Sequence, residues 1–286
     1  MQKLINDYTN YLKILGLAPR TITIYKTIIV KFLKIYPNPT EATQPQIIDF
    51  MLQRGSARTI QQTHGALNHF YSGVLGLGYI KKIPQPKAPD FVPNILSQIE
   101  VFQLFHNIKN IKHEAVLQLM YSGALRLGET LNLKIEDISK TENQIKIISG
   151  KGNKTAYVPI PKATKLLLRE YYRKHKPQVY LFEGQKGGKY SASSVRKVLN
   201  KALASVNINK HIRVHDLRHS RATHLLENGM DIKLLKDILR HKKIETTERY
   251  IHLTTKSLSN AMQQADTVME LNLTTAQKTQ SYLLAC

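Results

Sequence analysis

A proline-rich stretch near residue 87 constrains the fold of this chain more than any other feature of its sequence. Residues 81–93 read KKIPQPKAPDFVP and hold four prolines. Proline lacks the backbone N–H that a helix needs, and it biases the preceding residue toward extended geometry. A length of 286 residues also predicts about two domains, at roughly 150 residues each. We therefore predict one domain over residues 1–84, a linker over 85–94 and a second domain over 95–286.

An excess of basic residues predicts a polyanionic partner for both domains. Lys and Arg total 42 against 20 Asp and Glu, a formal net charge of +22. Residues 1–92 hold 11 basic and 4 acidic residues, and residues 93–286 hold 31 and 16. Nucleic acid is the polyanion that such a charge favours. A generically basic, ribosome-associated protein stays an alternative, because charge does not separate DNA from RNA or binding from catalysis.

Composition also excludes several classes of protein. The single cysteine, Cys286, excludes an internal disulfide framework and a cysteine-rich metal site. No apolar run approaches the ~20 residues of a membrane span, and the first residues do not form a signal peptide. Hydrophobic residues make up 42% of the chain, which is enough for packed cores. We expect a soluble, cytoplasmic protein.

Apolar residues at helical spacing run through the first domain. They predict four helices that begin near residues 4, 20, 45 and 56. Two of these helices carry side chains of the types that contact phosphates and base edges. Polar helix faces are more often simply solvated, so base contact is the less favoured interpretation. The candidate DNA-contact residues in this domain are Arg20, Thr21, Arg58, Thr59, Gln61 and Gln62.

The second domain is predicted to be mixed. Ser97 and Glu100 form a capping-box pair ahead of a helix-like stretch that reaches Tyr121. Alternating apolar residues and a Gly- and Asn-containing turn indicate strands and a hairpin. The strand patterns cover residues 131–135, 144–148 and 156–160, with the turn at 150–154. Helices dominate from residue 162 onward, so the fold class is mainly α with a small antiparallel β-sheet.

Five places in the second domain could act on a phosphate. In chain order they are Arg126, Lys151, the pair His215 and Arg218, then His241, then Tyr250. A guanidinium binds phosphate oxygens with a planar fork, and a neighbouring imidazole can move a proton. Each place also has an ordinary structural interpretation: a structural Arg–Glu pair, a solvated turn lysine, cations at a helix C-terminus, or a core tyrosine.

A metal site is a less favoured interpretation of these residues than direct binding of a phosphate. His215 and His219 have the spacing of metal ligands on a helix, but no carboxylate in an HExxH arrangement accompanies them. The sequence holds no Walker loop for ATP and no acidic cluster for a two-metal nuclease. We therefore expect no metal and no cofactor.

The order of these residues resembles that of the tyrosine recombinase (phage integrase) family, nearest to its compact Xer-like branch. The resemblance rests on the motif His-Asp-Leu-Arg-His-Ser at 215–220 and on a tyrosine nine residues after His241. Residues 17–36 and 56–71 are similar to the helical core-binding, SAM-like DNA-binding domain of that family. Residues 93–97 are similar to the entry to its mixed α/β catalytic domain, and residues 218–229 carry a highly specific part of its pattern.

The resemblance implies roles for the residues that match the family pattern. Tyr250 would attack a DNA phosphorus, and Arg126 and Arg218 would clamp its non-bridging oxygens. Lys151 would protonate the leaving 5′ oxygen, with Lys154 as the weaker candidate for that role.

The remaining matches imply supporting roles. His215 would help manage the proton of the nucleophile, and His241 would hydrogen-bond the phosphate. Glu129 would support the turn that carries Arg126.

Two residues depart from the family pattern. Arg240 stands where the family usually has glycine, so its side chain is expected to crowd the turn or to add a phosphate contact. Arg221 stands where an apolar or aromatic residue is common, and it is expected to face DNA, as is Lys242.

The resemblance implies recombination through a 3′-phosphotyrosyl bond and a Holliday junction, without metal or ATP. Four protomers would act on double-stranded DNA with inverted-repeat core sites, and residues 257–272 would dock on a neighbouring protomer. A tail packed on its own domain is the alternative for that segment. A paralogous recombinase or an accessory protein in the assembly also stays open. For the whole chain, the alternatives are a catalytically inactive DNA-binding regulator and a type IB topoisomerase.

Overall fold

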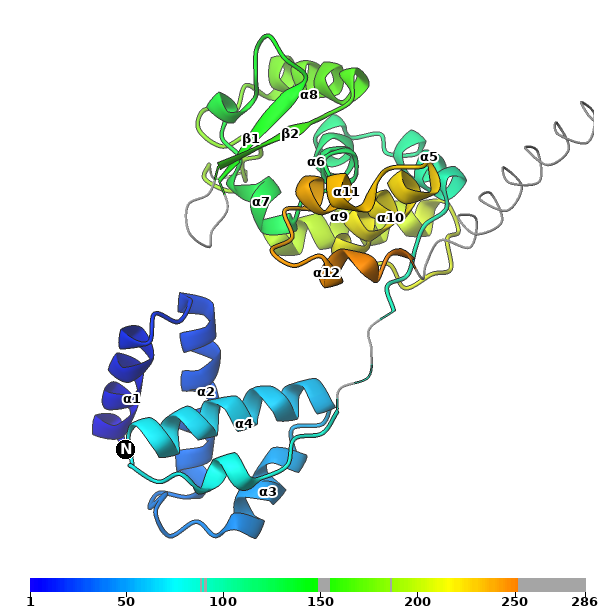
Figure 1. Ribbon diagram of the computed structural model, residues 1–286. Helices are drawn as coiled ribbons and strands as arrows, with labels where there is room; N and C mark the ends of the chain where they lie inside the picture. The colour runs from blue at the N-terminus through cyan, green and yellow to red at the C-terminus, as the bar shows by residue number, and fades with distance from the viewer. Residues whose placement is uncertain (88, 90–91, 149–154, 186, 252–286) are drawn as a thin grey trace, which may run out of the picture. The chain divides into compact units, whose positions relative to one another are not determined.

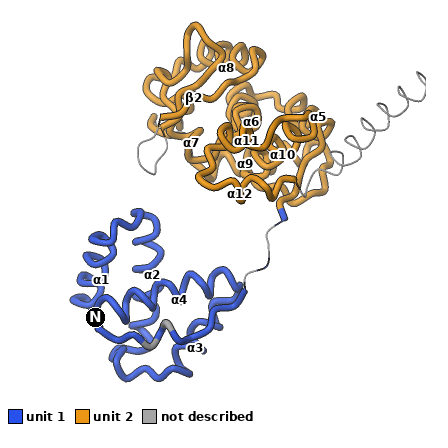
Figure 2. The backbone as a smooth tube through the Cα atoms, viewed as in Figure 1, with its two compact units in different colours: residues 1–92 blue, residues 93–286 orange. Residues whose placement is uncertain are grey.

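The chain divides into two compact units, Met1–Val92 and Pro93–Cys286 (Figure 2). The computed structural model describes residues 1–87, 89, 92–148, 155–185 and 187–251. The described part is mostly helical with one small antiparallel sheet, which confirms the predicted fold class (Figure 1). The boundary between the units falls inside the stretch predicted as a linker.

Unit 1 is a small helical bundle with an aromatic core. Phe32 is fully buried at its centre, with its ring centroid 5.1 Å from that of Phe50 and 6.1 Å from that of Tyr71. Ser56 caps one helix by accepting from the Thr59 amide, which agrees with the predicted helix start near residue 56. In its described residues, unit 1 contains α1 (Gln2–Ile14), α2 (Pro19–Ile35), α3 (Gln44–Leu52), α4 (Ala57–Gly73) and the 3-10 helix η1 (Tyr79–Lys82).

Unit 2 is built around helix α6, which packs against α5, α8, α9 and α10. Its core is mainly leucine, isoleucine and valine. A smaller second cluster, which includes Tyr250, joins α10 to α11. The described elements are α5 (Gln98–His106), α6 (Ile111–Ser122), α7 (Leu127–Asn132), η2 (Ile135–Asp137), β1 (Gln144–Ile148), β2 (Thr155–Pro159), α8 (Lys162–His175), α9 (Ala192–Ser205), α10 (Val214–Glu227), α11 (Ile232–Leu239) and α12 (Glu245–Glu248).

Strands β1 and β2 form the predicted antiparallel hairpin. Ile145 pairs with Val158, and both side chains are buried in the core of unit 2. The pairing brings together residues 148 and 155 at the turn end. The turn itself, with Lys151 and Lys154, lies outside the described residues.

Two sequence predictions for unit 2 need correction. The strand predicted over 131–135 is wrong, because Glu129 caps the backbone of Arg126 and starts α7, which runs to Asn132. The stretch predicted as helix-like up to Tyr121 is two helices, α5 and α6. The side chain of Asn110 accepts hydrogen bonds from two backbone amides and thereby starts α6 as a separate helix.

Candidate active site

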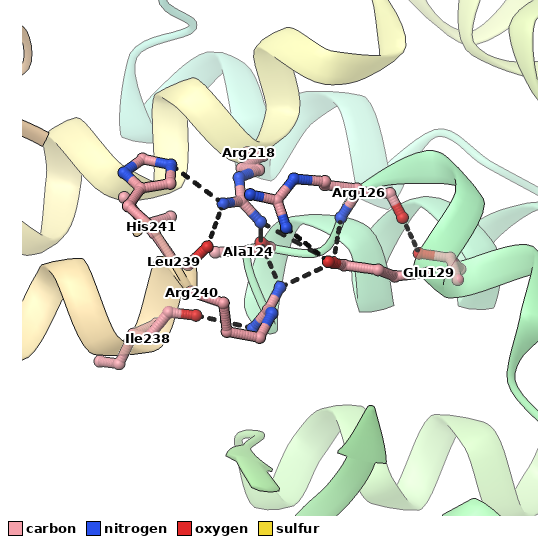
Figure 3. Close-up of polar contacts among 9 residues, drawn as sticks. Ala124, Arg126, Glu129, Arg218, Ile238, Leu239, Arg240 and His241 are labelled. Carbon is pink, nitrogen blue, oxygen red and sulfur yellow. Dashed lines mark hydrogen bonds and ion pairs between the residues drawn. The ribbon is translucent and has the colours of Figure 1, made fainter. Parts of the chain in front are cut away.

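Three segments of unit 2 bring basic side chains into one cluster (Figure 3). The turn before α7 carries Arg126, α10 carries Arg218, and the turn after α11 carries Arg240 and His241. Ala124 and Arg240 both have left-handed backbone, with φ of 46° and 54°. That conformation costs a non-glycine residue roughly 1–2 kcal/mol, so both turns are held in place by their surroundings.

Arg218 ties these segments together. Its side chain is only 1% exposed, and its Nη1 donates to the carbonyl oxygen of Ala124 at 2.6 Å. Its Nη2 donates to the carbonyl oxygen of Leu239 and lies 3.2 Å from Nε2 of His241. Burial, then the charges of Arg126 and Arg240, lower the pKa of Arg218 to about 9. The guanidinium is therefore still charged at pH 7 and held rigidly.

Glu129 is the carboxylate at the centre of the cluster. It accepts from the backbone N and Nη1 of Arg126 at 2.8 and 2.6 Å, and from Nη2 of Arg240 at 2.7 Å. It also lies 3.8 Å from Nη1 of Arg218. Burial would raise the pKa of Glu129, but Arg240 and Arg126 outweigh it, and the pKa lies below its ordinary value. Since three guanidinium groups surround this carboxylate, the cluster keeps excess positive charge, which suits a phosphate.

Arg240 turns into this cluster. Its Nη1 donates to the carbonyl oxygen of Ile238 at 2.7 Å, while its Nη2 bonds Glu129. The side chain is 9% exposed. An arginine in the place of the usual glycine therefore makes an internal ion pair in this structure, and it braces the turn that precedes His241.

His241 is held by a hydrogen bond at each ring nitrogen. Its Nδ1 lies 2.9 Å from Oγ1 of Thr247, and its Nε2 faces the donating Arg218. Because a guanidinium only donates, Nε2 is the acceptor and the proton is assigned to Nδ1. Burial, and then the charge of Arg218, lower the pKa of His241 to about 3. The imidazole is neutral at pH 7.

Tyr250 is buried beside this cluster. It is 1% exposed and packs with Ala124, Ala222, Leu235 and Leu239. Its ring lies parallel to that of His241, with 6.4 Å between centroids. Burial raises the pKa of Tyr250, and the charges of the neighbouring arginines, Arg218 first, only partly offset it.

His219 contacts the phenol of Tyr250, which the sequence analysis missed. Its Nδ1 lies 2.7 Å from Oη of Tyr250, and the imidazole is largely buried. From the sequence, His219 is a candidate only as a metal ligand. The available signal was its position directly after Arg218 on a helix. Adjacent side chains on a helix point in different directions, so His219 contacts other groups near the site than Arg218 does.

His215 lies on the exposed side of α10, although Arg218 on the same helix is buried. Its ring meets that of His219 edge to face, with 4.8 Å between centroids. Local desolvation, then the charges of Arg218 and Arg126, lower the pKa of His215. Within the described residues, no group of three or more His, Cys, Asp and Glu side chains could hold a metal ion.

The remaining predicted DNA-contact residues fall into two groups. Arg20, Arg58, Gln62 and Lys242 are exposed, and Thr21 is half-buried. The others have partners inside the protein: Thr59 bonds Ser56, Gln61 donates to the carbonyl oxygen of Pro86, and the guanidinium of Arg221 lies 5.5 Å from the ring centroid of Tyr121. The predicted exchange segment, residues 257–272, lies outside the described residues.

Comparison with known proteins decides the family. The model of the phage integrase family matches residues 94–257, and that of the phage integrase N-terminal SAM-like domain matches residues 4–80. The chain belongs to the phage integrase family. It is a tyrosine recombinase of the Xer-like kind.

Individual relatives agree with this assignment. The tyrosine recombinase XerA of Pyrococcus horikoshii is 29% identical over 92% of this chain and 93% of its own length. A putative integrase/recombinase, y4eF, of Sinorhizobium fredii is 31% identical over 68% of this chain and 78% of its own.

Solved structures agree as well. A crystal structure of XerA recombinase matches with a TM-score of 0.57 and 26% identity, over 92% of this chain and 98% of that one. A lambda integrase dimer bound to a core site shares the fold, with a TM-score of 0.72 at 15% identity over 87% and 76% of the two chains. In the part of the chain that the structure describes, no helix has the length and apolar character to cross a membrane.

Proposed function

We propose that this chain is a site-specific DNA recombinase that cleaves and rejoins DNA through a 3′-phosphotyrosyl intermediate. The proposal rests on one observation: Tyr250 lies buried beside a hydrogen-bonded cluster of arginines. Arg218, Glu129 and Arg240 hold the α10, α7 and α11 segments together beside the phenol.

The proposed chemistry uses charge where a nuclease uses metal ions. Arg126, with a side chain 40% exposed, and Arg218 would bind the non-bridging oxygens of the scissile phosphate. Tyr250 would attack the phosphorus, and Lys151 would protonate the leaving 5′ oxygen, with Lys154 as its weaker substitute. The phosphotyrosyl bond keeps the energy of the broken phosphodiester, so rejoining needs no ATP.

We propose supporting roles for the neighbouring side chains. His241 would donate to the phosphate from Nδ1 after giving up its bond to Thr247. His215 would stabilise the same phosphate from its exposed position. Glu129 would fix Arg126 in place by its two hydrogen bonds to that residue.

The proposed substrate is double-stranded DNA with inverted-repeat core sites, which four protomers bring together in a Holliday junction. Two solved structures that share the fold support this proposal. One is a lambda integrase tetramer bound to a Holliday junction, and the other is the XerH site-specific recombinase bound to its difH substrate before cleavage. Residues 257–272 would join the protomers. A protein that acts on cellular DNA in this way is expected in the cytoplasm.

Covalent capture tests the proposal. Wild type and Tyr250→Phe are expressed in the source cell, the cells are denatured rapidly, and protein-linked DNA is sequenced. The wild type alone should yield one short inverted-repeat site, and pure protein should form the same bond in EDTA. Equal recovery from both proteins, or none while specific binding persists, would leave a DNA-binding regulator. Supercoil relaxation without sequence preference would instead indicate a topoisomerase.

A further inference from the structure

We propose that His219 is a catalytic residue that takes the phenolic proton of Tyr250 during cleavage and returns it during rejoining. The proposal rests on the proposed function and assigns the proton transfer within it. The sequence comparison implies that His215 manages this proton, but the geometry points to its neighbour one turn later on α10.

The hydrogen bond between His219 and Tyr250 places a base directly on the reacting atom. Nδ1 lies 2.7 Å from Oη, within the range for proton transfer. The two rings are 5.6 Å apart at their centroids, and both residues are largely buried. Among the described contacts of the Tyr250 hydroxyl, this is the one with a group that can accept its proton.

The surroundings of His219 keep its imidazole neutral, which is the form that can take a proton. The groups that face it are His215, Asp216, Arg218 and Arg213, and the carboxylate of Asp216 is itself bonded to Arg213. Burial first, and then the facing cations, lower the pKa of His219 to about 4. A neutral imidazole with its proton on Nε2 presents a lone pair at Nδ1. In that tautomer the phenol donates and Nδ1 accepts.

Tyr250 needs such a base more than a solvent-exposed tyrosine does. Its burial raises a pKa that already lies far above pH 7. The neighbouring arginines stabilise a phenolate once it forms, but an arginine cannot remove a proton. A base in contact with Oη supplies the missing step.

The proposed step is balanced in both directions. In cleavage, the Oη–H proton moves to Nδ1 of His219, the Oη–P bond forms, and the P–O5′ bond breaks. The electron pair leaves with O5′, which takes a proton from the lysine proposed as general acid. In rejoining, the 5′ hydroxyl attacks the phosphorus, the P–Oη bond breaks, and Nδ1 returns its proton to Tyr250.

A merely structural role for His219, as a latch that keeps Tyr250 buried, predicts that loss of the imidazole base does not slow cleavage. The asparagine side chain offers an acceptor oxygen near the position of Nδ1 but takes no proton at neutral pH. His219→Asn therefore keeps the latch and removes the base. His219→Ala removes both.

The test is single-turnover cleavage of a nicked DNA site that traps the phosphotyrosyl product, measured on two substrates. One has the natural 5′ oxygen at the scissile bond, and the other has a 5′ sulfur, which leaves without needing a proton. We expect His219→Asn and His219→Ala to slow cleavage of both substrates about 10²–10⁴-fold. The low-pH limb of the wild-type rate profile should also disappear. By contrast, Lys151→Ala should recover on the sulfur substrate, because its defect lies in the leaving group.

Each contrary outcome is distinguishable. If His219→Asn cleaves at the wild-type rate, or if His219→Ala cleaves faster, His219 is only a latch and the proposal is wrong. Recovery of either variant on the sulfur substrate would also overturn it. If the wild type itself forms no covalent product, the proposed function fails instead. DNA binding and thermal melting of each variant are measured alongside, so that a misfolded protein is not read as an inactive one.

Discussion

The aromatic core of unit 1 and the basic cluster of unit 2 are both buried, but they are held together by different forces. Around Phe32, aromatic rings pack at centroid distances of 5.1 and 6.1 Å, and these ring contacts need no paired donor and acceptor. Around Arg218, named donors and acceptors meet, and each guanidinium that is buried needs its partner. Burial of apolar area tolerates exchange of similar side chains, whereas a buried charge without its partner is costly.

Glu129→Gln should break this comparison most strongly. The substitution keeps the shape of the side chain but removes the charge that faces Arg126, Arg218 and Arg240. Removing one partner of a buried ion pair costs about 3–5 kcal/mol, so we expect that loss in unit 2. Amide hydrogen exchange measured by mass spectrometry reports the stability of each unit in the full chain.

Glu136→Gln is the matched control. Glu136 pairs with Lys134, but its side chain is 73% exposed, and an exposed pair contributes about 0–1 kcal/mol. If the two glutamine variants lose equal stability, the cluster around Glu129 is no more than a surface ion pair.

The next largest difference in stability between the two units should appear in mild acid. His219 and His241 have folded pKa values of about 4 and about 3, below the ordinary 6.5. Above pH 6.5 both are neutral in either state. Below pH 6.5, the two histidines take up protons in the unfolded chain but stay neutral in the folded one. The free energy of unfolding therefore falls as pH falls. Each group costs up to about 1.4 kcal/mol per pH unit.

Between pH 6.5 and 5 we therefore expect unit 2 to lose roughly 2–4 kcal/mol. This window lies above the ordinary pKa of 4.5 for Glu129, so the carboxylate does not contribute. In unit 1, His69 is the one described histidine with a lowered pKa, and burial is the cause. Unit 1 should therefore lose less stability than unit 2. Equal losses in α2 and α10, after correction for intrinsic exchange rates, would contradict the assignment.

The success of prediction from the sequence also differs between the aromatic core of unit 1 and the basic cluster of unit 2. The helices of unit 1 were placed to within two residues or so at their starts, because apolar spacing and caps such as Ser56 are local signals. The candidate active-site residues come from the family resemblance, and among them the charge of Arg218 acts on Tyr250. The bond between His219 and Tyr250 spans 31 residues, and the inward turn of Arg240 needs Glu129 from 111 residues away. Contacts of that kind depend on the tertiary fold and leave no periodic pattern.

Phe32→Leu should have a smaller effect than Glu129→Gln or mild acid. The smaller side chain loses aromatic contacts with Phe50 and Tyr71 but keeps an apolar group in the same space. A large-to-small change in a core costs about 0.5–1.5 kcal/mol for Ile→Val and about 3–5 kcal/mol for Phe→Ala. Phe32→Leu lies between these, and we expect a loss of about 1–2 kcal/mol, confined to unit 1. Hydrogen exchange in α2 and α4 measures it. A loss as large as that of Glu129→Gln would mean that the aromatic core is as exacting as the charged cluster.

Arg240→Gly should have the smallest effect, because two contributions offset each other. Glycine restores the residue usual in the family and removes the left-handed strain at φ 54°, worth roughly 1–2 kcal/mol. The same change deletes the ion pair with Glu129, which still keeps both hydrogen bonds to Arg126. We expect a net change in stability within about 1 kcal/mol.

Arg240→Ala separates the two contributions, since alanine loses the ion pair and keeps the strain. It should be about 1 kcal/mol less stable than Arg240→Gly in the same unfolding experiment. Both variants should raise the pKa of Glu129, because Arg240 is the charge that lowers it most. If glycine proves no more stable than alanine, the turn is not strained, and Arg240 is held there by its ion pair alone.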